Sequence, residues 1–268
     1  MLDHGPLSNA CANGKILPLY ILEPNLWRQP DVSYRHFLHL QHYLSQLDDM
    51  FIKKGAKLVI KVGEALPVLK SLATRHNVKA IFSHYETWNK FSKDRDSAIR
   101  KWTDENSVDW KEYQQNGVVR NLNSRDGWST LWHGHMRKKI YEIPEKICCI
   151  SEDSDNLPSC QDMSLEFDGF EPNSNLGKIE PGIVLKSFLT ERGENYQREM
   201  SGPLLSADSC SRLSTHIAFG TISIRTIFQR TQEQTQKKLD LVEDKLKNWR
   251  ASYNSFQKRL RWHCHFIQ

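Results

Sequence analysis

KLVIKVGEALPVLKSLATRHNVKAIFS, residues 57–83, contains two short apolar runs separated by an amphipathic stretch. Residues 57–62 and 78–83 are rich in Val and Ile and have the length of buried strands. Between them, residues 64–76 carry Leu66, Leu69 and Leu72 on one side of a helical pattern. A strand, a helix and a second strand in one segment predict a parallel pair joined by a right-handed crossover.

The flanking sequence repeats this alternation. Residues 15–22 predict a strand, Ser33 begins a helix that Gly55 ends, and residues 94–105 predict another helix. Residues 108–113, with Val118 and Val119, continue the sheet. The pattern predicts an α/β fold, a doubly wound, Rossmann-like parallel sheet covered on both faces. Such a sheet normally opens with a strand, but residues 3–11 have the character of a helix, so we expect the first strand to be missing.

The second half of the chain has a different character. Glu, Asp, Ser, Asn, Pro and Gly dominate residues 140–180, which predicts a linker. Helical patterns then follow at residues 183–191, 196–200, 211–218, 223–231 and 232–266. We therefore expect an α/β domain at residues 1–139, a linker at 140–180 and the N-terminal part of an all-α domain at 181–268, in a chain incomplete at both ends.

The composition restricts the classes of function. The 37 Lys and Arg exceed the 32 Asp and Glu, and the net charge of +5 is compatible with a polyanionic partner. The six cysteines include no CxxC pair, which favours free thiols in a reducing compartment and no zinc site. No apolar run is long enough for a signal peptide or a membrane span. These features predict a cytoplasmic protein with no membrane segment and no metal, which we expect to be a monomer.

Local chemistry points to one segment. GxGxxG, Walker A and GxSxG motifs are absent, so the sheet carries no ordinary nucleotide or hydrolase signature. Residues 209–214, SCSRLS, combine hydroxyl groups and an Arg at the predicted start of a helix. Such groups bind phosphate, and the segment predicts a pyrophosphate cradle. The alternative is an ordinary helix start capped by Ser209 or Ser211.

This segment resembles the T-S-R-L-S-P-x-L-x-x-G-x-L-S motif of the DNA photolyase/cryptochrome family. Ser211, Arg212, Leu213 and Ser214 match the motif, whereas Cys210 replaces its Thr and residue 215 replaces its Pro. The first half of the chain is also similar to the family, at residues 22–27, 84–96 and 125–128. The resemblance implies that the motif surrounds the pyrophosphate of FAD and that Tyr196 contacts the flavin.

The last segment resembles the family pattern W-x-x-E-x-x-W-R. Phe256 stands at its first Trp, Arg259 at its Glu, Trp262 at its second Trp and His263 at its Arg. The resemblance places Phe256 and Arg259 in the cofactor site, and Trp262 and His263 against the DNA lesion. The Glu contacts the pyrimidine dimer in the family, so its replacement by Arg259 is a departure that bears on repair.

The resemblance implies a deoxyribodipyrimidine photo-lyase, a flavoprotein that uses light-driven electron transfer to repair pyrimidine dimers in UV-damaged DNA. FAD would be the cofactor, and an antenna folate (MTHF) or deazaflavin chromophore would bind the α/β domain. Two alternatives stay open: a cryptochrome-like blue-light receptor without repair activity, and an inactive fragment. No catalytic residue is assigned, and we expect the chain alone neither to hold FAD tightly nor to repair DNA.

Overall fold

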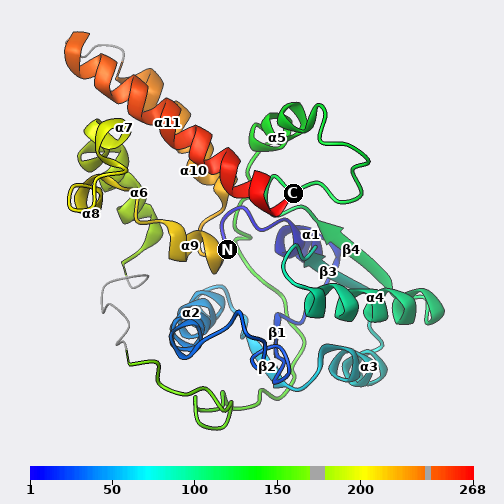
Figure 1. The fold of residues 1–268 in the computed structure, drawn as a ribbon. Helices are drawn as coiled ribbons and strands as arrows, with labels where there is room; N and C mark the ends of the chain where they lie inside the picture. Colours follow the sequence, from blue (N-terminus) through cyan, green and yellow to red (C-terminus); the bar gives the residue numbers. More distant parts are fainter. Residues whose placement is uncertain (170–178, 239–242) are drawn as a thin grey trace. The chain divides into compact units, whose positions relative to one another are not determined.

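The computed structural model describes residues 1–169, 179–238 and 243–268 (Figure 1). These residues form two compact units. An α/β unit contains Met1, residues 3–115 and residues 141–169, and a helical unit contains Leu2, residues 116–140 and the described residues from 179 onward.

Four strands lie in the α/β unit. β1 (Leu19–Leu22) pairs in parallel with β2 (Val59–Val62), with Leu19 opposite Val59. β3 (Ala80–His84) pairs in parallel with β4 (Asp109–Tyr113), with Ala80 opposite Asp109. The predicted α/β class with parallel strands is confirmed. In the described residues, however, the strands form two separate two-stranded ladders (Figure 1).

Four helices belong to this unit: α1 (Gly5–Asn13), α2 (Tyr34–Ile52), α3 (Ala65–His76) and α4 (Lys90–Glu105). Ser33 begins α2 as predicted, because its side chain accepts a hydrogen bond from the backbone N–H of His36. α4 begins earlier than the predicted residue 94. Asn89 is its N-cap and accepts a hydrogen bond from the backbone N–H of Ser92 at 3.0 Å.

The apolar faces of α3 and α4 share one cluster with the strands. Its buried members are Ala65, Ile99, Trp102 and Val108, and Ile21 of β1 and Ile81 of β3 pack against it. On the other face of the second ladder, Tyr113 of β4 lies beside Gly5 of α1. Burying each large apolar side chain contributes about 1.5–3 kcal/mol, so these helices supply much of the unit's stability.

Residues 141–169 contain no named helix or strand, yet they are anchored to the α/β unit. Ile16 and Cys149 form an isolated parallel bridge. The backbone N–H of Asp155 donates to the carbonyl of Ile60 at 2.8 Å, along the outer edge of β2. This part of the predicted linker therefore packs as an ordered strap on the unit.

The helical unit contains short and long helices: α5 (Trp128–Met136), α6 (Pro181–Thr190), a 3₁₀ turn η1 (Arg192–Asn195), α7 (Tyr196–Glu199), α8 (Ser206–Ser209), α9 (Ser214–Ala218), α10 (Ile224–Lys237) and α11 (Glu243–Ile267). α5 and α8 were not predicted. The predicted continuous stretch 232–266 is divided between α10 and α11, and its residues 239–242 lie outside the described part of the chain.

The core of the helical unit corrects two expectations. Val118 is buried there with Trp132, Phe188 and Phe228, so the predicted strand at residues 118–119 is wrong. Residues 116–139, which we assigned to the α/β domain, pack in the helical unit. Trp128, Trp132 and Met136 of this segment are buried in the core of the helical unit, and Gln229 of α10 donates to the carbonyls of residues 136 and 138 at 2.8 Å each.

Candidate cofactor-binding site

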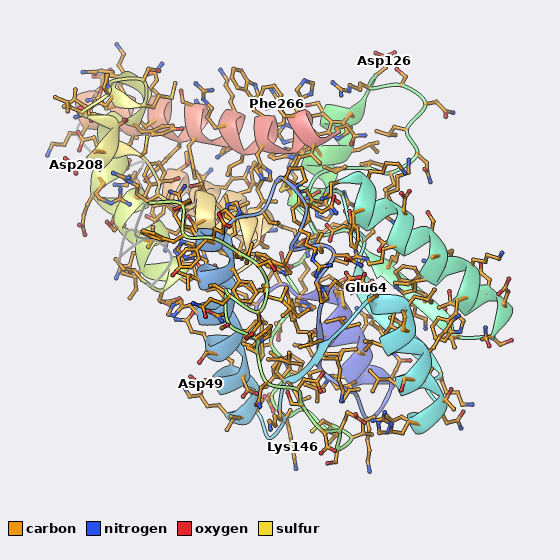
Figure 2. All side chains as sticks on the ribbon, turned by 60° about the horizontal axis from the view of Figure 1, so that its bottom comes forward. Asp49, Glu64, Asp126, Lys146, Asp208 and Phe266 are labelled. Atoms are coloured by element: carbon orange, nitrogen blue, oxygen red, sulfur yellow. The ribbon has the colours of Figure 1, made fainter. Side chains whose placement is uncertain are left out.

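One arginine organises the loop that precedes α9. The guanidinium of Arg192 donates to the carbonyl of Cys210 at 2.6 Å and to that of Asp208 at 2.9 Å. It also donates to Ser187 Oγ at 2.8 Å and to the carbonyl of Ser211 at 3.4 Å. Figure 2 labels Asp208 in this group of short helices. Because three carbonyls of the loop accept from one planar guanidinium, they are turned toward Arg192.

The backbone beyond this anchor has the conformation of an anion-binding nest. Arg212 lies in the left-handed region with φ 61°, and Leu213 follows in the right-handed region with φ −97° and ψ −2°. A left-handed residue next to a right-handed one directs successive N–H groups toward one concave side. The N–H groups of residues 211–215 have no acceptor among the described residues. This turn therefore presents several donors to one ligand.

Side chains around the nest add donors. Within the described part of the chain, the hydroxyl groups of Ser211 and Ser214 have no hydrogen-bond partner, and Ser214 is exposed. The guanidinium of Arg212 turns back and donates through Nε to the carbonyl of Ala207 at 2.7 Å. The positive charge of Arg212 thus stays beside the turn, while part of its N–H donors is already bonded to the carbonyl of Ala207.

The local structure differs from the predicted helix start. α9 begins at Ser214 and not at residue 211, and its N-cap, Leu213, makes no side-chain capping bond. Ser209 is buried and donates to the carbonyl of Leu205 at 3.0 Å, so neither Ser209 nor Ser211 caps α9. With five residues α9 has a small dipole. Any anion affinity of this segment comes from the turn.

Tyr196 and Phe256 lie in the core. Their side chains are 6% and 4% exposed. Phe188 contacts both, with ring centroids 5.4 Å from Tyr196 and 4.6 Å from Phe256. Burial raises the pKa of Tyr196. Tyr196 and Phe256, the two predicted flavin contacts, are thus neighbours in the core of the helical unit and do not lie on its surface.

The end of α11 is an exposed aromatic surface. The Arg259 guanidinium lies 4.5 Å from the ring centroid of Trp262, and the Trp262 and Phe266 rings meet edge to face at 6.2 Å. Trp262 is 45% and Phe266 is 78% exposed, and His263 is exposed as well. Exposed rings of this kind can stack on a planar ligand. The prediction missed Phe266, although its position four residues after Trp262 places it on the same helix face.

The charge of Arg259 on α11 acts on Tyr196 and on Cys210, which lies in the loop before α9. Burial raises the pKa values of Tyr196 and Cys210, and the charge of Arg259 acts on both in the opposite direction. Arg259 also contacts Met200 Sδ at 4.0 Å. The structure therefore brings Arg259 within electrostatic range of Tyr196 and of the residue that begins the motif.

Two cavities of the described residues are lined by none of the nine predicted site residues. One cavity, of about 630 Å³, lies in the helical unit and is lined by Arg137, Gln229, Gln232, Glu233, Thr235, Gln236, Asn254 and Gln257. A second, of about 230 Å³, lies in the α/β unit, where Glu23, Glu64, Asp94 and Arg95 line it together with apolar side chains.

Within the described residues, His, Cys, Asp and Glu form no cluster of three or more that could hold a metal ion. Among the same residues, every helix is too short or too polar to cross a membrane.

Comparisons with known proteins agree on one family. The family model described as DNA photolyase matches residues 1–125. A deoxyribodipyrimidine photo-lyase of Halobacterium salinarum is 24% identical over 69% of this chain and 41% of its own length. A cryptochrome DASH of Arabidopsis thaliana is 22% identical over 89% of this chain and 46% of its own length. The chain thus spans less than half of each of these relatives.

Solved structures share the fold. A Synechocystis cryptochrome superposes with a TM-score of 0.79 at 18% identity, and a class III photolyase of Agrobacterium tumefaciens with 0.72 at 16%. A Sulfolobus tokodaii photolyase described with two FAD molecules gives 0.64 at 23%. Each match covers 99% of this chain and 56–58% of the solved chain.

Proposed function

Because this chain belongs to the photolyase/cryptochrome family, we propose that it supplies the pyrophosphate-binding part of an FAD site. Its function would be the light-driven repair of pyrimidine dimers in UV-damaged DNA. An antenna folate (MTHF) or deazaflavin would then bind the α/β unit. FAD would supply the electron-transfer chemistry, and the chain would supply binding and orientation.

The observation that carries this proposal is the nest at residues 211–215. The two phosphates of FAD need several donors converging from one side. The turn offers consecutive backbone N–H groups together with the hydroxyls of Ser211 and Ser214. Arg192 holds the carbonyls of this loop away from the ligand side, since they accept its hydrogen bonds. The donors are therefore arranged before a ligand arrives, which lowers the entropic cost of binding.

The aromatic end of α11 would meet the DNA. An extruded base presents a planar face, and stacking on an aromatic side chain contributes about 1–3 kcal/mol per base. Trp262 offers such a face at 45% exposure. His263, one residue further along the same helix, is exposed and would lie near the phosphates that flank the base.

A second function, a blue-light receptor of the cryptochrome type, is favoured by Arg259. The family pattern has a Glu at this position to accept hydrogen bonds from the dimer, and a guanidinium has no acceptor. Arg259 instead lies over Trp262. Illuminating the full-length protein with FAD and a thymine-dimer oligonucleotide, and assaying the dimers, discriminates between the functions: restored thymines support repair. We expect no turnover from this chain alone.

The test of the cofactor proposal is a binding titration in the dark with FAD, ADP and riboflavin. We expect FAD and ADP, which contain a pyrophosphate, to bind weakly, with dissociation constants above the micromolar range, and riboflavin not to bind. A sub-micromolar affinity for FAD would contradict the expectation that the chain alone binds it weakly. Binding of riboflavin as tight as that of FAD would refute the pyrophosphate site.

A pair of variants separates the backbone nest from the charge. Arg212→Gly and Arg212→Val both remove the guanidinium, but only Gly accepts the left-handed conformation without strain. A β-branched residue there costs roughly 1–2 kcal/mol, or about tenfold in affinity. We expect the Val variant to bind ADP about tenfold more weakly than the Gly variant. Equal affinities would show that the nest does not bind the phosphates.

A further inference from the structure

One cavity of the helical unit takes no part in the proposed cofactor site. It has a volume of about 630 Å³ and lies between Arg137, at the end of α5, and the neighbouring helices α10 and α11 (Figure 1). α10 supplies Gln232 and Gln236 to its lining, and α11 supplies Asn254 and Gln257. The described side chains that line it are all polar or charged. Ligand sites are mostly apolar, so this polar groove fits a ligand that binds through hydrogen bonds and charge.

The polar groove and the predicted cofactor and lesion contacts lie on opposite sides of α11. An α-helix turns by about 100° per residue, so Arg259 and His263 share one side of α11. Asn254 and Gln257 are rotated from that pair by about 170° on average. A ligand in the groove therefore does not compete for the side of α11 that carries Arg259.

Four amide side chains of the groove are free to bind a ligand. Gln232, Gln236, Asn254 and Gln257 have no hydrogen-bond partner within the described residues. Gln229 differs, since it donates to the carbonyls of residues 136 and 138. Each free amide offers N–H donors and an acceptor oxygen. A peptide backbone carries the same pairing of donor and acceptor, whereas phosphate oxygens of nucleic acids only accept. The groove is therefore more complementary to a peptide.

Positive charge gathers where the groove meets α5. Arg137 lines the groove and has no partner in the part of the chain that the structure describes. Arg261, one turn after Gln257 on α11, donates to Ser129 Oγ of α5 at 3.2 Å. Burial, followed by the charges of Arg137 and Arg261, lowers the pKa of His133 on α5. Both guanidinium groups thus lie within electrostatic range of one ring, and an anionic group at this end of the groove meets two positive charges.

The carboxylate of the groove does not cancel this charge. Glu233 lines the groove, but it pairs with Arg230 at 2.9 Å. Arg250 precedes Asn254 by one helical turn and Lys258 follows it by one turn, and both side chains are exposed. Among the described residues, the groove is therefore bordered by more positive than negative side chains.

We propose that the polar groove binds an extended, acidic peptide segment of a partner protein. The four free amides would bond to the backbone of the segment, and Arg137 and Arg261 would bind carboxylates of its Asp or Glu side chains. Nucleic acids fit less well. Single strands bind by stacking their bases on aromatic rings, which the described lining lacks, and a duplex backbone would leave the acceptor oxygens of the amides unused.

The probe is the peptide acetyl-Gly-Glu-Ser-Glu-Ser-Glu-Gly-amide, titrated into the isotopically labelled full chain. We expect the side-chain amide NMR signals of Gln232, Gln236, Asn254 and Gln257 to shift and to saturate. The same peptide with Gln in place of each Glu is the matched control. It should bind at least about tenfold more weakly, because the charge-assisted hydrogen bonds are lost.

Variants of the protein test the same contacts from the other side. Arg137→Gln should weaken binding of the acidic peptide about tenfold, and Asn254→Ala about threefold. Arg28→Gln makes the same charge change at an exposed residue of the α/β unit and should alter the affinity by less than about twofold.

Three results would overturn the proposal. The first is the absence of a saturable shift of the four amide signals, or equal affinities of the two peptides. The second is equal weakening by Arg137→Gln and Arg28→Gln. The third is a dimer-free DNA duplex that shifts the same signals at lower concentration than the acidic peptide, since a nucleic acid would then be the occupant.

Discussion

Glu152 attaches residues 141–169 to the rest of the α/β unit. The effect of removing its charge on the free energy of unfolding can be calculated. Its carboxylate is 2% exposed and lies 2.8 Å from Lys61 Nζ and 2.6 Å from His76 Nε2. Arg75 donates a further hydrogen bond to it. Glu152→Gln keeps the size of the side chain but removes the charge that these three groups face.

The shift in the pKa of Glu152 gives the size of its contribution to the free energy of unfolding. Hydrogen bonds from Lys61, then from His76, lower the pKa of Glu152 from 4.5 to about 2. Each pKa unit corresponds to about 1.36 kcal/mol, so the charged form stabilises the fold by at most about 3 kcal/mol at pH 7. Because the folded pKa is the lower one, this stabilisation is complete above the unfolded pKa and declines as the pH falls through 4.5 toward 2. At pH 3 about half of it remains.

The assay is urea unfolding of wild type and Glu152→Gln at pH 7 and pH 3, followed by circular dichroism. We expect a difference in the free energy of unfolding of about 2–3 kcal/mol at pH 7 that falls by about half at pH 3. Asp153→Asn is the control, since it makes the same charge change at an exposed neighbour and should alter stability by less than about 0.5 kcal/mol. A difference independent of pH, or equal effects of the two variants, would refute the electrostatic argument.

Three further predictions concern the helical unit. Gly117→Ala places a Cβ 2.0 Å from the Trp132 ring and should destabilise the unit by about 3 kcal/mol or more. Gly134→Ala in α5 meets no atom within 4 Å and should stabilise the unit by up to about 1 kcal/mol. A thermal melt that ranks the stabilities of the two variants the other way would contradict this packing. Arg192→Lys removes the planar guanidinium that binds the loop carbonyls. The substitution should lower the free energy of unfolding by about 2–3 kcal/mol and weaken ADP binding. ADP binding at wild-type strength would show that these hydrogen bonds are unnecessary for the site. Ser223→Ala removes the cap that accepts from the N–H of Thr226 at 2.9 Å and should cost about 1 kcal/mol in thermal unfolding, and an unchanged melting temperature would count against the cap.

The local elements were largely predictable because their signals are local. The strands at residues 57–62 and 78–83 and the helix between them follow from hydrophobic spacing, and the structure contains all three within a few residues of the predicted ends. α5 was missed because Gly134 and a run of aromatic and His residues lower its intrinsic helix propensity. Tertiary packing of Trp128 and Trp132 stabilises it instead.

The candidate site was only partly visible in the sequence. The motif located Ser211–Ser214, but the left-handed backbone of Arg212 replaces the predicted helix start. The role of Arg192 was not predicted, since the three loop carbonyls that accept from it lie 16, 18 and 19 residues further along the chain. The motif likewise did not reveal that Tyr196 and Phe256 support the site from the core.

By itself, the sequence determined the order of strands and helices, their parallel arrangement and the family resemblance, because hydrophobic period and motif spacing are properties of neighbouring residues. Only the tertiary structure decided that residues 116–140 join the helical unit, that Glu152 is surrounded by three basic side chains, and that the described strands form two separate ladders. These features depend on which distant backbone and side-chain groups satisfy one another's hydrogen bonds and charges, and no local pattern encodes that choice.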